Sequence, residues 1–130
     1  MKILQPPGWS RPRGYANGVS AEGRLVFVAG QIGWDATGSL VAAEFPGQFG
    51  QVLRNTLDVL SEAGAGPEHI VRMTWYITDR QAYLDCAPEV GKIYRGLMGN
   101  HYPAMAVVEV SALMEAGALV EIESTAVVPT

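Results

Sequence analysis

Hydrophobic and polar positions along the chain change their spacing several times, and each spacing predicts a different element. Residues 25–28 form an unbroken run of β-favouring side chains, which predicts a short strand over residues 24–29. Further on, apolar residues recur every three or four positions with charged residues opposite, which predicts an amphipathic helix. We expect this helix to span roughly 18 residues and to end near Gly64 and Gly66. Its apolar stripe consists of Phe49, Val52, Leu53, Thr56, Leu57 and Leu60.

Strict alternation over residues 70–78 predicts a second strand, and a helix is expected to follow it. Asp79 comes directly after the strand and can cap that helix. The apolar stripe of the helix continues to Leu97, but Pro88 lies within it, so we expect a kink or a late helix start. One face of the strand carries Val71, Met73, Trp75 and Ile77.

Two more alternating segments, residues 104–111 and 118–128, predict the last two strands. The resulting order of elements is typical of an α+β domain in which two helices cover one face of a mixed sheet. We expect the opposite face to be too apolar for open water, although it carries carboxylates, and a second subunit to cover it. The pattern therefore predicts an oligomer. That opposite face is expected to carry Met105, Val107, Glu109, Leu119, Glu121 and Val127.

Composition and charge are those of one small domain. The 130 residues, 48% hydrophobic and 17% charged, suffice for one packed core, so we expect a single domain over residues 1–130. A formal net charge of −4 without a cluster of Lys and Arg argues against a nucleic-acid partner. The single cysteine, Cys86, and the distant histidines His69 and His101 lack the spacing of metal ligands. The proline-containing residues 1–14 predict an extended arm, and without a signal peptide or membrane helix we expect a cytoplasmic protein.

Four short segments, in order along nearly the whole chain, resemble motifs of the RidA (YjgF) family, which is also called endoribonuclease L-PSP-like. They are GYANG at residues 14–18, AGQI at residues 29–32, YPAMAVVEV at residues 102–110 and VEIE at residues 120–123. Each segment alone is a weak signal. Four of them in the family's order make a specific resemblance.

The resemblance implies a chorismate-mutase-like fold, with a mixed six-stranded sheet, two helices on one face and a homotrimer around a central barrel. It also implies small-molecule pockets between neighbouring subunits, no cofactor, no metal, and no nucleic-acid or membrane partner. RidA-like hydrolases convert reactive enamines and imines such as 2-aminoacrylate to a keto acid and ammonia. A related branch deaminates 2-aminomuconate.

The same resemblance assigns roles to single residues, each with a structural alternative. Glu121 matches the glutamate that orients the attacking water, or it is a carboxylate satisfied at the subunit contact. Tyr15 matches a pocket tyrosine, or it is an interface aromatic. Gly30 matches a site where the backbone approaches the ligand, or it simply ends a strand. Met105 and Val107 are expected to line the same pocket, or to pack at the interface.

One position departs from the family pattern. In deaminating members the residue after Pro-Ala is an arginine that grips the substrate carboxylate as a bidentate fork, and Met105 stands there in this chain. Methionine has neither charge nor donor, so we expect the substrate to depend less on an α-carboxylate. Arg11 or Arg13 can reach across an interface and supply the charge, or they belong to a solvated arm.

Two hypotheses for the function follow. The first is an enzyme that hydrolyses an enamine or imine, of the aminomuconate type or another catabolic intermediate, with Glu121, Gly30 and Tyr15 around the substrate. The second is a trimer that binds or senses a small metabolite without catalysis. Ammonia release from a panel of imines discriminates between them.

Overall fold

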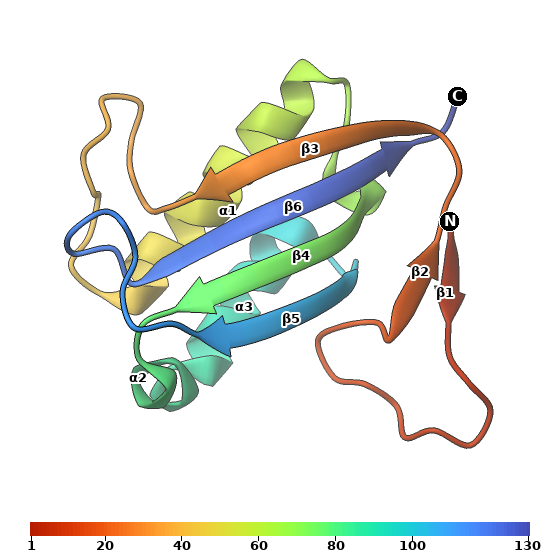
Figure 1. Cartoon of the computed structure of the whole chain (residues 1–130), viewed down its shortest axis with the longest axis horizontal. Coiled ribbons are helices and arrows are strands. Elements are labelled where there is room, and N and C mark those ends of the chain that lie inside the picture. Colours follow the sequence, from red (N-terminus) through yellow and green to blue (C-terminus); the bar gives the residue numbers. More distant parts are fainter.

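The computed structural model describes all 130 residues, and its centre is a four-stranded mixed sheet with helices behind it (Figure 1). The strands lie in the order β3 (Arg24–Gln31), β6 (Val120–Val128), β4 (Ile70–Ile77) and β5 (Ala104–Glu109). Strand β6 pairs antiparallel with both β3 and β4, whereas β5 pairs parallel with β4. The α+β class and the mixed sheet are therefore as predicted.

Two short strands, β1 (Lys2–Leu4) and β2 (Gly18–Ser20), form a separate antiparallel pair at one end of the sheet (Figure 1). The expected six strands are present, but in sheets of four and two rather than in one sheet. A single parallel bridge between Ala16 and Ala104 links the arm to β5, and the Ala16 N–H donates to the Pro103 carbonyl over 2.9 Å. Because Pro103 has no N–H of its own, the ladder does not continue through it.

The first predicted helix, α1 (Phe45–Glu62), has the expected length of 18 residues. Pro46 lies in its first turn, where a missing N–H costs no intrahelical hydrogen bond. Gly64 follows the helix with a φ of 68°, a conformation that glycine adopts without strain. The prediction of a glycine stop is thus confirmed.

The second predicted helix is divided into α2 (Arg80–Asp85) and α3 (Ala87–Met98). A separate turn of 3-10 helix, Pro67–His69, lies between α1 and β4. Pro88 lies in the first turn of α3, which confirms the late start expected there. Asp79 caps α2 as predicted, because its carboxylate accepts a hydrogen bond of 3.0 Å from the Ala82 N–H. None of the helices combines the length and the apolar character needed to cross a membrane.

Helices α1 and α3 pack on the same face of the sheet and form the hydrophobic core with it. Met73, Trp75 and Ile77 face this core as their alternation predicts, but Val71 does not. A register shift in the pairing of β4 with β6, between Ile70 and Arg72, turns the fully buried Ile70 inward instead. The largest fully buried core side chains are Phe49, Leu53, Leu60, Ile70, Met73 and Ile122.

The face expected for Met105, Val107 and Glu109 is wrong. Met105 pairs with Met73, and Val107 with Trp75, in the parallel ladder of β4 and β5. Paired residues point to the same side of a sheet, so these side chains lie on the helix-covered face. Glu109 likewise bonds to the Arg80 N–H, and Leu119 packs against the core. The sequence could not show this, because both faces of this edge strand are apolar.

The sheet face away from the helices, called the open face below, is bare within one chain (Figure 1). Glu121 and Glu123 lie there as expected, beside Tyr76 and Thr74 of β4. Large apolar side chains are exposed on the same face. They include Leu25 at 58%, Phe27 at 71% and Val108 at 41% exposure.

Candidate active site

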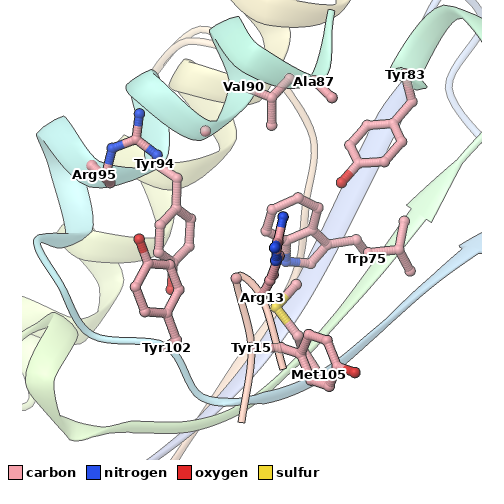
Figure 2. A pocket seen from close by; sticks show the side chains of 13 residues that line it. Arg13, Tyr15, Trp75, Tyr83, Ala87, Val90, Tyr94, Arg95, Tyr102 and Met105 are labelled. Carbon is pink, nitrogen blue, oxygen red and sulfur yellow. The ribbon is translucent and has the colours of Figure 1, made fainter. Parts of the chain in front are cut away.

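A cavity of about 390 Å³ lies between the helix-covered side of β4 and β5, helix α3 and the N-terminal arm (Figure 2). Five of its 13 lining residues carry aromatic rings, so we call it the aromatic cavity. Three residues expected to line a pocket meet here, namely Tyr15, Met105 and Val107. The other lining residues are Arg13, Gly14, Trp75, Tyr83, Ala87, Val90, Gly91, Tyr94, Arg95 and Tyr102.

The rings of the aromatic cavity are held by packing against one another. The Trp75 ring lies 6.4 Å from that of Tyr83, edge to face, and 6.1 Å from that of Tyr94. Tyr94 stacks on Tyr102 with ring centroids 5.4 Å apart, within the range that favours aromatic pairs. The Tyr94 hydroxyl donates to the His101 carbonyl over 2.7 Å, and burial raises the pKa of Tyr94 far above its ordinary value. This part of the wall is therefore a connected set of ring contacts, in which Tyr94 stays uncharged.

Two arginines bring positive charge to the aromatic cavity. Arg13 comes from the arm and Arg95 from α3, and Figure 2 shows both among the lining side chains. The guanidinium of Arg95 lies along Gly91, where a Cβ atom would come within 3.2 Å of Nη1. Neither arginine has a carboxylate oxygen within ion-pair distance in the chain, where the only such contact is between His69 and Glu68.

The indole N–H of Trp75 is a buried donor without an acceptor. Trp75 is only 5% exposed and lines the aromatic cavity. A buried polar group without a partner is costly, and native structures contain few of them. The wall of the cavity thus carries an unused hydrogen-bond donor.

A second cluster lies on the open face and joins Glu121 to Gly30. The pairing of β3 with β6 shifts register between Val28 and Gln31, so the strand bulges at Gly30. A Cβ atom at residue 30 would collide with the Glu121 side chain, with Cδ only 2.8 Å away. The absence of a side chain at Gly30 is what allows the carboxylate to lie against this backbone.

Glu123 is the neighbouring carboxylate on the open face, and unlike Glu121 it has a hydrogen-bond partner within the chain. Its Oε1 atom accepts a hydrogen bond of 2.8 Å from the Tyr76 hydroxyl. This hydrogen bond is the main reason that the pKa of Tyr76 is raised above 10.0. Glu121 makes no such bond and no ion pair within the chain. Of the two carboxylates, Glu121 is the one free to bind a water molecule or a substrate.

The expected site residues thus form two groups on opposite sides of one sheet. Tyr15, Met105 and Val107 meet in the aromatic cavity, while Gly30 and Glu121 meet on the open face. A single chain does not bring the two groups together. The two arm arginines also separate, because Arg13 lines the aromatic cavity whereas Arg11 lines a neighbouring cavity with Trp9 and His101.

Sequence reasoning missed several residues of the aromatic cavity. Tyr83 and Tyr94 have the spacing of a helix stripe, which predicts core rather than cavity wall. Nothing in the sequence marked Arg95 as a cavity residue, apart from its place in the last turn of a helix. Tyr102 stands in the YPAMAVVEV motif, and that position was the only available clue. No group of three or more His, Cys, Asp or Glu side chains is arranged to hold a metal ion.

Comparison with known proteins gives the same family throughout. The family model described as endoribonuclease L-PSP matches residues 10–128. A RutC family protein of Pyrococcus abyssi is 35% identical over 105 residues, which are 80% of this chain and 79% of that protein. The human 2-iminobutanoate/2-iminopropanoate deaminase is 30% identical over 105 residues, covering 80% of this chain and 73% of the deaminase.

Solved structures agree with this assignment. A member of the conserved Rid protein family from Yersinia pestis superposes with a TM-score of 0.87, at 32% identity over 98% of both chains. RidA from an Antarctic Psychrobacter superposes with a TM-score of 0.70, at 28% identity over 98% of this chain and 99% of that one. The match to the family model over most of the chain, together with these relatives, shows that the chain belongs to the endoribonuclease L-PSP family, which includes the RidA (YjgF) proteins.

Proposed function

We propose that the protein hydrolyses a reactive enamine or imine, releasing ammonia, in a pocket formed where two copies of the chain meet. The observation that carries this proposal is the Glu121 carboxylate, which lies against the bulged backbone at Gly30 and has no partner of its own. A free carboxylate beside an accessible backbone can hold a water molecule next to a substrate carbon. The names of the deaminase relatives support the same reaction class.

The reaction needs one base and one water molecule. Glu121 takes a proton from the water, whose oxygen attacks the carbon of the protonated C=N bond. A carbinolamine forms, and Glu121 returns the proton to its nitrogen. The carbinolamine hydroxyl then gives its proton to Glu121 while its oxygen forms the C=O bond, and the C–N bond breaks with its electron pair on nitrogen. Ammonia and a carbonyl compound leave, and Glu121 is left with one proton, which balances the proton that the C=N group carried at the start. The reaction involves no oxidation or reduction.

The open face supports a site that a second copy completes. Leu25, Phe27 and Val108 are exposed on the same face as Glu121 and Gly30. Exposed apolar residues grouped on one sheet face indicate an interface between proteins. In the trimer implied by the family, we place Glu121 and Gly30 of one copy opposite Tyr15, Met105 and Val107 of its neighbour. Neither group is complete without the other.

The test is ammonia release from imines generated in the assay, comparing the wild type with Glu121→Gln. We expect Glu121→Gln to lower kcat by roughly 10²- to 10⁴-fold, the usual worth of a general base. Glu123→Gln is the matched control, because Glu123 lies on the same strand and face but is bonded to Tyr76. The control should stay within a few-fold of the wild type. Equal activity of the wild type and Glu121→Gln would contradict the role given to Glu121.

A second candidate function rests on Met105, which has no positive charge where deaminating relatives carry arginine. A trimer with this residue can bind a metabolite in the same pocket without turning it over. Calorimetry with keto acids, run beside the ammonia assay, separates the two functions. Binding without ammonia release from any imine of the panel would replace the enzyme by this binding protein.

A further inference from the structure

We propose that the aromatic cavity binds a planar aromatic or conjugated carboxylate, and that Arg13 and Arg95 supply the anchoring charge that Met105 lacks. The inference rests on the proposed function in one respect, because the ligand is taken to be the substrate or product of the deamination. The binding site itself stands on the cavity, and it is tested without turnover.

The size and the walls of the aromatic cavity fit one ring. A volume of about 390 Å³ lies near the lower end of the range for small-molecule sites, which is roughly 300–1,000 Å³. Four of its five aromatic residues, Trp75, Tyr83, Tyr94 and Tyr102, form a cluster of ring contacts along its wall (Figure 2). Such walls favour a flat π-system over a short aliphatic chain, because ring pairs gain from stacked and edge-to-face contact.

The charge at the aromatic cavity selects an anion. Arg13 and Arg95 both line it, and no carboxylate of this chain neutralises either one. A guanidinium presents several donors in a plane that matches a carboxylate. The Arg95 guanidinium lies beside Gly91, where a Cβ atom would come within 3.2 Å of its Nη1 atom. The cavity therefore pairs an apolar interior with two unneutralised cations.

Trp75, which lines the cavity, also carries an unpaired indole N–H. This donor is buried in the cavity wall and has no acceptor within the chain. The Nε1 atom has no exposed surface, so ligand binding here rests on the rings and the two arginines. The apolar character of Met105 then fits the scheme, because the residue contacts the ligand's hydrocarbon part while the charge is bound by Arg13 and Arg95.

The experiment measures the binding of phenylpyruvate by calorimetry at fixed salt, with pyruvate and the methyl ester of phenylpyruvate as comparison ligands. Phenylpyruvate has the ring and the charge, pyruvate lacks the ring, and the ester lacks the charge. We expect phenylpyruvate to bind at least tenfold more tightly than either. Affinity equal to that of pyruvate would overturn the aromatic part of the proposal, and affinity equal to that of the ester would overturn the anionic part.

Variants test the two arginines. The double variant R13A/R95A should bind phenylpyruvate at least tenfold more weakly than the wild type. Both side chains are exposed, so the fold should survive, which circular dichroism checks. R11A is the matched control, because Arg11 is on the same arm but lines the neighbouring cavity, and it should keep wild-type affinity. Wild-type affinity in R13A/R95A, or an equal loss in R11A, would overturn the assignment.

The outcomes separate this inference from the proposed function. Tight phenylpyruvate binding that depends on Arg13 and Arg95, without ammonia release from any imine, would contradict the proposed deamination but support the proposed binding site. Turnover that depends on Glu121 but shows no preference for aromatic imines would contradict the proposed aromatic site but support the proposed deamination.

Discussion

Met105 and Glu121 lie on opposite faces of the same sheet. Met105 stands beside Met73 on the helix-covered face, and Glu121 stands beside Tyr76 on the open face. The two positions that the family resemblance assigns to one pocket are therefore kept apart by the sheet within each chain. A pocket containing both requires two chains, which makes the oligomer part of the proposed chemistry rather than an addition to it.

Restoring the arginine should change which substrate is accepted. M105R places a bidentate donor in the wall of the aromatic cavity, and we expect kcat/KM for 2-iminopropanoate to rise by at least roughly tenfold. M105K carries the same charge without the planar fork and should gain less. The larger side chain should also weaken phenylpyruvate binding by filling the cavity. A folded M105R with unchanged kcat/KM for 2-iminopropanoate would contradict this assignment.

Adding one methyl group at Gly30 should disable the site while sparing the fold. In G30A the new Cβ displaces the Glu121 carboxylate, a flexible group that can move at little cost in stability. We expect kcat to fall roughly hundredfold, as for other small displacements of catalytic groups. G96A is the control, because a Cβ there meets nothing within 4 Å and should leave kcat unchanged. Equal kcat for G30A and the wild type would show that Glu121 need not lie against Gly30.

Gln48 is a fully buried polar side chain that ties three backbone groups together. Its Nε2 donates to the carbonyls of Ala42 and Gly117 over 3.0 and 2.9 Å, and its Oε1 accepts from the Leu119 N–H over 2.8 Å. Q48A leaves all three unpaired, so the free energy of unfolding should fall by roughly 3 kcal/mol or more in urea denaturation.

The control for this substitution is Q81A, which removes an exposed amide bonded only to Asp85. Its free energy of unfolding should stay within about 0.5 kcal/mol of the wild type. An equal effect of Q48A and Q81A would show that burial of the Gln48 network adds nothing.

The loop after β3 gives a pH-dependent prediction. The pKa of Asp35 is held below 3.8, mainly by the Thr37 hydroxyl at 2.6 Å and then by the Ser39 and Thr37 backbone N–H groups. The pKa of Asp35 is lower in the folded protein than in the unfolded chain. The ionised carboxylate therefore stabilises the fold at pH values above the unfolded pKa, and this stabilisation is lost as the pH falls through the folded pKa. D35N should be less stable than the wild type at neutral pH, and the gap should narrow below pH 3.8. T37A should reproduce most of the difference, and a gap independent of pH would contradict this explanation.

Local pattern was enough to predict the elements whose signal lies within one segment. The apolar stripe beginning at Phe49 predicts α1, and Pro88 predicts where α3 begins, because each depends on residues next to it in the chain. The face of β5 depends instead on its parallel pairing with β4, about thirty residues away. Val108 is as apolar as Val107, so alternation cannot say which one faces the helices.

The candidate site was predictable only in part, for a related reason. Gly30 and Glu121 stand in separate motifs, and the family resemblance named both before the structure showed them in contact. Tyr15, Met105 and Val107 were also predicted to share a pocket, and they line the aromatic cavity, but the rings around them were not predicted. Tyr83 and Tyr94 occupy helix positions that pattern alone assigns to the core, and a gap between packed helices and strands leaves no trace in sequence spacing.

The central claim, that one site draws on two chains, is tested most directly by mixing two inactive variants. Y15A damages one half of the proposed site and E121Q the other, so each variant alone should show little ammonia release. When equal amounts are unfolded and refolded together, random trimers should contain about a quarter of their sites intact, with that share of wild-type activity. A mixture no more active than its components, although trimers form, would show that both residues act within a single chain and would contradict the account.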